Sequence, residues 1–176
     1  MNRPKQDALL SELTDQLNQR GSWCGETHIQ KAAYFLQELR KVPLGFDFIL
    51  YKHGPFSFDL RDELTAMRAD GFLDLYSQGP YGPSLLPTRR SVELRQDYPK
   101  TLQKYGRDMQ FVCDALGNQN VAELEKLATA LYVYFQHESG SRRVRAKILH
   151  DLKPHISFSD ALEAVNQVDA LVERSA

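Results

Sequence analysis

The residue types that most often do chemistry are few in this chain and form no familiar catalytic set. The sequence has five histidines and two cysteines. The histidines show neither the His-Glu-x-x-His spacing nor another metal-ligand spacing. A Gly-x-Ser-x-Gly elbow is absent from the sequence, and so is a Gly-rich phosphate loop with its lysine. We therefore expect a protein that is not an enzyme and that uses no metal and no cofactor.

Cys24 and His28 are the one pair that resembles a nucleophile with its base, and Trp23 precedes them. A lone cysteine beside an aromatic residue more often packs in a core or a loop. Asp47 and Lys52 share a predicted strand, but their spacing does not match a nuclease strand and the other acids are missing. Packing is the favoured interpretation of Cys24.

Basic residues gather in two clusters. These are Arg142, Arg143, Arg145 and Lys147 in the first, and Arg89, Arg90 and Arg95 in the second. On one common face, the two clusters would favour a nucleic acid or an acidic protein as partner. The alternative, which we favour, is a solvated face with local helix pairs such as Glu93 with its arginines. The net charge of −1 gives no global field that would attract DNA or a membrane.

Three further side chains are candidates for contact with a partner. Tyr81 stands between two Gly-Pro pairs at the tip of a predicted hairpin, where it would touch a protein or a minor groove, or pack back onto the C-terminal helices. Arg61 and Arg68 lie on a helix predicted over 59–70. Acids on that helix match or outnumber its bases, so its insertion in a major groove is disfavoured.

The segment that must position these residues runs from Tyr51 to Thr88. Gly54 and Pro55 predict a turn, which either forms a functional loop or, as we favour, aims the helix that Ser57 or Asp59 caps. Alternating residues predict strands over 46–51, 72–77 and 84–88. Helix, strand, loop and strand in this order outline a winged-helix half-domain.

The remaining chain reads as helix, with apolar residues at helical spacing over 5–20, 27–39, 102–116, 120–135, 144–152 and 157–172. Capping boxes are predicted at Thr27 with Gln30 and at Asn120 with Glu123. Residues 89–99 are polar and mark the boundary between two regions of the chain. The fold class is therefore mainly α with a small β-hairpin (α+β): a winged-helix-like domain at 1–90, and a helical C-terminal region at 91–176 packed on it.

Composition and cysteine content indicate the class of protein and its cellular compartment. A hydrophobic fraction of 42% is typical of a globular core. Two distant cysteines, Cys24 and Cys113, exclude a disulfide framework. Since no apolar run approaches the roughly 18 residues of a membrane span, we expect a cytoplasmic protein without a membrane partner.

The chain resembles the YwgA-like proteins and the wider Panacea (SocA-like) group. The resemblance lies in Gln30 to Leu36, Pro43 to Phe46, the Tyr51 to Ser57 turn and the pattern Leu60, Leu64, Gly71, Phe72, and it continues through Leu86-Pro87-Thr88 and Leu124 to Tyr132. It implies a winged-helix-like architecture, no established catalytic residues, and a toxin as partner, which the protein neutralises by direct contact or hands to a protease.

We therefore expect a regulatory module that acts through protein contact, antitoxin-like or adaptor-like. The alternative is a winged-helix DNA-binding regulator that uses the basic clusters for phosphate contacts, as a homodimer. The strand predicted over 46–51 separates the two helices that a helix-turn-helix would join closely, which weakens the DNA analogy.

Overall fold

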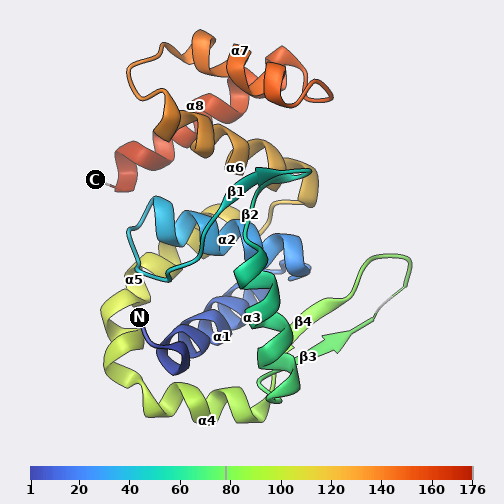
Figure 1. The fold of residues 1–176 in the computed structure, drawn as a ribbon, viewed down its shortest axis with the longest axis vertical. Coiled ribbons are helices and arrows are strands. Elements are labelled where there is room, and N and C mark those ends of the chain that lie inside the picture. Colours follow the sequence, from blue (N-terminus) through green and yellow to red (C-terminus); the bar gives the residue numbers. More distant parts are fainter. Residues whose placement is uncertain (78, 176) are drawn as a thin grey trace.

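The computed structural model describes residues 1–77 and 79–175, and it is mainly helical with two small sheets (Figure 1). This confirms the predicted fold class. The helices are α1 (Arg3–Gln19), α2 (Glu26–Glu38), α3 (Phe58–Ala69), α4 (Arg89–Asp97), α5 (Pro99–Leu116), α6 (Val121–Gln136), α7 (Arg142–Leu152) and α8 (Phe158–Ser175). The strands are β1 (Ile49–Tyr51), β2 (Gly54–Phe56), β3 (Leu73–Tyr76) and β4 (Ser84–Pro87).

Each sheet is a single antiparallel hairpin. In the first hairpin Ile49 pairs with Phe56 and Tyr51 with Gly54; in the second, β3 pairs with β4 from Leu73–Pro87 to Tyr76–Ser84. The helix–strand–loop–strand outline of α3, β3 and β4 is confirmed. Strand β1, in contrast, pairs with β2 and not with the second hairpin.

The strand predicted over 46–51 is shorter than expected and begins at Ile49. A glutamine replaces its missing partner strand: the Gln37 amide accepts the N–H groups of Gly45 and Phe46 at 2.9 Å each and donates to the Phe46 carbonyl at 2.8 Å. Because these backbone groups are already satisfied, the segment needs no strand partner.

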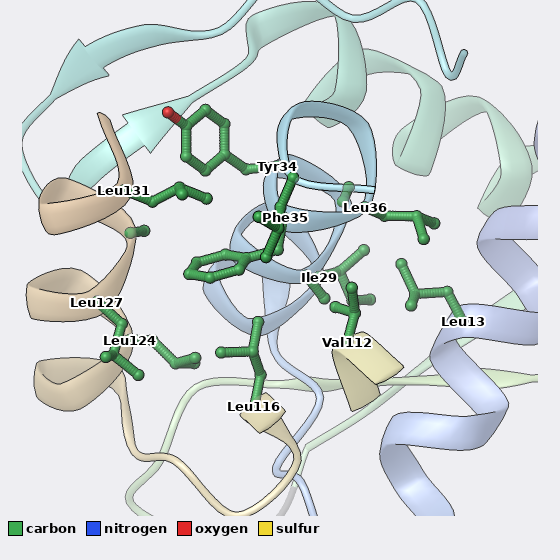
Figure 2. Close-up of a cluster of buried hydrophobic side chains, with 14 of the residues drawn as sticks. Leu13, Ile29, Tyr34, Phe35, Leu36, Val112, Leu116, Leu124, Leu127 and Leu131 are labelled. Atoms are coloured by element: carbon green, nitrogen blue, oxygen red, sulfur yellow. The ribbon is translucent and has the colours of Figure 1, made fainter. Parts of the chain in front are cut away.

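Helix α2 lies at the centre of the core (Figure 2). Phe35 points from α2 toward Leu124 and Leu127 of α6 on one side and Leu116 of α5 on another. Leu13 of α1 approaches the opposite side of α2. One continuous apolar cluster therefore includes residues from both parts of the chain that the sequence separates near residue 90.

Helix caps are confirmed at two of the predicted positions and wrong at a third. Ser57 Oγ accepts the Leu60 N–H at the start of α3, and Asn120 caps α6 at the Glu123 N–H. Helix α2 instead begins at Glu26, and its N-cap Gly25 provides no side chain. Gln30 takes another role because its amide binds both the N–H and the carbonyl of Ser57, at 2.9 and 2.8 Å.

The polar segment after β4 is itself a helix, α4, which Thr88 caps at the Ser91 N–H. Helices α4 and α7 lie at opposite ends of the long axis of the molecule (Figure 1). Among the described residues, no helix is both long and apolar enough to cross a membrane.

Candidate functional site

The two basic clusters do not converge on one face. Arg89 and Arg90 begin α4 at one end of the molecule, whereas the Arg142 to Lys147 run lies on α7 at the other end (Figure 1). A continuous basic surface built from both clusters is therefore excluded by their placement.

The α7 run is largely used within the protein. Arg145 is 6% exposed, and its two terminal nitrogens donate to Asp169 at 2.7 and 3.0 Å. Arg142 Nε donates to the same carboxylate at 2.8 Å. Burial raises the pKa of Asp169, but the hydrogen bonds from both arginines outweigh it and hold the pKa below its usual value. Arg145 therefore anchors α7 on α8 and is not available to a partner.

Arg95 is largely buried and binds Glu12 and Asp15 of α1 at 3.2 and 2.9 Å, whereas the other members of the two clusters lie at the surface with local contacts. Lys147 pairs with Asp151 at 2.7 Å, and the Arg143 guanidinium lies 5.8 Å from the Phe158 ring. Arg89 pairs with Glu93 at 3.6 Å, as the local interpretation expects, and Arg90 lies over Phe72 at 5.4 Å. Most of this positive charge is thus balanced or stacked locally.

Two buried lysines bind the backbone of the Tyr51 to Ser57 turn on its inner side. Lys31 is 1% exposed, and its Nζ donates to the Pro55 carbonyl at 2.7 Å. Lys153, at the end of α7, donates to the carbonyls of Tyr51, at 2.7 Å, and Lys52. Burial lowers the pKa of Lys31 from 10.5 to about 8, against the opposing charge of Glu125.

Glu125 of α6 is the buried acid of this arrangement. Its carboxylate lies 3.4 Å from Lys153 Nζ, 3.2 Å from His155 Nε2 and 3.6 Å from His53 Nδ1. Gly54 has a φ of +84°, and a Cβ there would meet Thr129 Oγ1 at 2.9 Å. The turn therefore packs as a structural element on α2 and α6, which is the interpretation the sequence favours. Within residues 1–77 and 79–175, no three His, Cys, Asp or Glu side chains are close enough to hold a metal ion.

The outer surface of the same hairpin carries exposed aromatic residues. Tyr51 and Phe58 meet edge to face with ring centroids 5.4 Å apart, and Phe56 lies 5.2 Å from Phe58. The Arg61 guanidinium lies 5.0 Å from the Phe58 ring. With Ile49, which is exposed opposite Phe56, these residues form what we call the aromatic–arginine face.

Arg61 also borders a hollow of about 160 Å³ between α3 and the second hairpin. Arg68 and Leu75 line it, together with Glu26 and Pro83. We call it the arginine hollow. Arg3 of α1 binds Glu63 of α3 and Asp70 at the C-cap of α3 at 2.8 Å each, whereas Asp62 of α3 pairs with Arg61 at 3.1 Å.

A larger cavity of about 710 Å³ adjoins the arginine hollow and shares Glu26 and Pro83 with it. Its walls come from the starts of α2 and α6 and from the loop of the second hairpin. We call it the Trp23 cavity; its lining is Trp23, Gly25, Glu26, Thr27, His28, Tyr81, Gly82, Pro83 and Asn120 to Ala122. Tyr81 is 72% exposed and meets Trp23 at 5.4 Å between ring centroids, so it packs on the N-terminal loop and not on the C-terminal helices.

Cys24, next to Trp23, is buried, and its Sγ contacts the Thr14 carbonyl at 3.5 Å. Burial raises the pKa of this thiol to about 12, so the reactive thiolate is strongly disfavoured. The prediction that Cys24 packs in the interior is confirmed.

The structure therefore brings together three of the predicted contact residues, Arg61, Arg68 and Tyr81, on two adjoining hollows. Sequence reasoning missed Tyr51 and Phe58 as surface residues, and it missed the cavity at Trp23. The one tryptophan of the chain lies two residues before Gly25, but only the fold shows that this glycine starts α2 without a capping side chain. Scans against protein-family models and curated proteins find no match for this chain.

Proposed function

We propose that this protein is a non-enzymatic regulatory module that binds another protein, in the manner of an antitoxin or an adaptor. The aromatic–arginine face carries the proposal. Tyr51, Phe58 and Arg61 are exposed together and contact one another there. Aromatic and arginine side chains contribute most of the binding energy at protein interfaces, and a cluster of them at a surface supports such a role.

The positive charge beside this face indicates which side chains the partner presents to it. Arg61 and Arg68 line the arginine hollow with the apolar Leu64 and Leu75. Among the described residues, no carboxylate lies within 4 Å of Arg68. Arg61 already pairs with Asp62 at 3.1 Å, so a partner that places an apolar side chain in the hollow and a carboxylate at Arg68 matches this surface.

The rigidity of the face also supports binding. The first hairpin is held by Lys31 and Lys153 from inside the protein, and Ser57 fixes the start of α3 at Phe58. Side chains that are already ordered lose less conformational entropy when a partner docks.

Site-specific photo-crosslinking in the native host tests the proposal. A photoreactive residue at position 51 or 58 should link the same protein, whereas one at Val144, which is exposed on α7, should not. The purified partner should then bind the chain, and Phe58→Ala with Arg61→Glu should weaken that binding at least about a hundredfold. If the partner is a toxin, the unmodified chain should relieve its toxicity and the double variant should not.

Identical adducts at Phe58 and Val144, or none, would contradict the proposal. Retardation of duplex DNA at low salt, abolished by Arg142→Glu with Arg143→Glu, would replace it with the DNA-binding alternative.

A further inference from the structure

The Trp23 cavity has the size and lining of a small-molecule site. Its volume of about 710 Å³ falls in the range of ligand pockets. Two aromatic rings, Trp23 and Tyr81, form one wall, and Val121 and Ala122 of α6 form another. Trp23 Nε1 donates to the Gly82 carbonyl at 2.7 Å, which fixes the indole ring against the hairpin loop. The walls therefore fit a planar apolar group.

The floor of the cavity is the start of α2. This helix has 13 residues, and no side chain caps its first-turn amides because its N-cap is Gly25. The backbone at Gly25 is extended, with φ −71° and ψ 172°, as at helices that a serine caps. Free amides at a helix start attract a carboxylate through their N–H groups and the helix dipole.

His28 supplies a second polar group at the same point. Its side chain is 5% exposed and lines the cavity. In the described part of the chain no group hydrogen-bonds its Nδ1. A buried polar atom without a partner is unfavourable, so a ligand that binds it gains this interaction.

These groups converge within van der Waals distance of one position. A Cβ placed on Gly25 would lie 3.5 Å from Trp23 Cδ1, 3.5 Å from the Pro83 carbonyl oxygen and 3.7 Å from His28 Nδ1. Acceptors and donors are therefore adjacent here. The Pro83 carbonyl and the Glu26 carboxylate can accept from a cation, while the α2 amides donate to an anion.

We infer that the Trp23 cavity binds a free aromatic L-amino acid. Its α-carboxylate accepts from the α2 amides and from His28 in the Nδ1–H tautomer. Its ammonium donates to the Glu26 carboxylate and the Pro83 carbonyl, and its ring packs on Trp23 and Tyr81. A phosphate-bearing ligand fits less well, because Glu26 is the one charged side chain in the lining. A purely cationic ligand would face the positive end of α2.

The single tryptophan makes the test direct, since its fluorescence reports on the cavity wall. L-phenylalanine, which does not emit in that range, should change Trp23 emission with saturation, and calorimetry should give the same affinity. L-tyrosine and L-tryptophan are tested by calorimetry. Phenethylamine lacks the carboxylate, 3-phenylpropionate lacks the ammonium and glycine lacks the ring, so each should bind at least about tenfold more weakly than L-phenylalanine.

One variant separates binding from folding. Gly25→Ser places a hydroxyl where the ligand carboxylate would bind, and that hydroxyl caps the α2 amides. Its melting temperature should equal or exceed that of the unmodified chain, whereas its affinity for L-phenylalanine should fall at least about tenfold. Glu26→Gln should remove the preference for L-phenylalanine over 3-phenylpropionate. Gly106→Ala on α5, where the added Cβ meets no atom within 4 Å, is the matched control and should bind L-phenylalanine normally.

The inference is overturned if none of the three aromatic amino acids binds by about 10 mM, or if Gly25→Ser binds L-phenylalanine normally. The inference is also overturned if the unmodified chain binds 3-phenylpropionate or phenethylamine as tightly as L-phenylalanine, because the site would then not recognise both charged groups of an amino acid. These measurements use the isolated chain, so their failure leaves the proposed protein contact untouched, and a failed crosslink at Phe58 leaves the ligand unaffected.

Discussion

The two β-hairpins are similar in topology and opposite in how the protein holds them. In the first, β1–β2, Gly54 packs against α6, and the buried side chains of Lys31 and Lys153 donate to backbone carbonyls of the hairpin. The second, β3–β4, is held along β4, where Leu85 is buried, its N–H donates to the Cys24 carbonyl and its carbonyl accepts from Asn18 Nδ2. Toward its loop, Tyr76 and Tyr81 are exposed.

This difference separates scaffold from site. Buried charges tie the first hairpin into a single position and leave its outer side chains to form the aromatic–arginine face. The second hairpin packs on α1 and α3 through Leu73 and Leu85, while Tyr81 to Pro83 in its loop form a wall of the Trp23 cavity and do not belong to the core. Changes beneath the first hairpin should therefore reduce stability, and changes at the loop of the second should alter binding.

Lys153→Met should have the largest effect. It leaves the Glu125 carboxylate buried without its lysine and leaves two hairpin carbonyls without their donor. Loss of one member of a buried ion pair reduces the unfolding free energy by about 3–5 kcal/mol. Urea denaturation measures the loss. Lys147→Met, on the same helix but exposed and paired with Asp151, should change it by less than about 0.5 kcal/mol. Equal losses in both variants would remove the distinction between buried and surface lysines.

The pH dependence of stability should reveal the lowered pKa of Lys31. Burial lowers the pKa of folded Lys31 to about 8, whereas unfolded Lys31 titrates near 10.5, so the unfolded chain binds more protons between these values. The contribution of Lys31 to the unfolding free energy should therefore rise as pH increases from about 8 to 10.5, by up to about 3 kcal/mol.

Other groups oppose this trend, so a reference variant is needed. Burial raises the thiol pKa of Cys24 and Cys113 to about 12, which makes the protein lose stability above pH 9. Lys31→Met retains both cysteines. The difference in unfolding free energy between the unmodified chain and this variant, measured from pH 7.5 upward, should increase with pH; a constant difference would show that Lys31 keeps its usual pKa.

Gly54→Ala should weaken the first hairpin by about 2 kcal/mol. An L-residue at φ +84° is strained, and its Cβ would approach Thr129 Oγ1 at 2.9 Å. Gly82→Ala is the matched change in the second hairpin, where the added Cβ meets no atom within 4 Å and φ is not positive. Its unfolding free energy should stay within about 0.5 kcal/mol of the unmodified value. Comparable losses would mean that both turns are equally constrained.

Features that depend on neighbouring residues could be predicted from the sequence. Asn120 and Ser57 cap their helices because the capped amide lies only three residues away in each case. Gly71 adopts φ +77° at the end of α3, as a glycine after a helix predicts. The α3–β3–β4 outline follows from the same local signals.

Features that join distant segments could not be predicted in this way. Lys31 and Glu125 lie on predicted helices and Lys153 directly follows a third, and charged residues at such positions normally face solvent. Asp169 of α8 binds both Arg142 and Arg145, so the basic run looks freer in the sequence than it is in the fold. The Trp23 cavity likewise needs three segments, around Trp23, Tyr81 and Val121, to meet.

Tyr81→Ala should reduce stability less than Gly54→Ala does. The side chain is mostly exposed, and its main aromatic contact is the edge-to-face pair with Trp23. Removing this pair should reduce the unfolding free energy by at most about 1 kcal/mol, while Trp23 emission should shift because its ring becomes more exposed to water. Denaturation followed by circular dichroism measures the first quantity independently of the second. A loss above about 2 kcal/mol would mean that the loop of the second hairpin supports the core, and the division between a scaffold hairpin and a site hairpin would then fail.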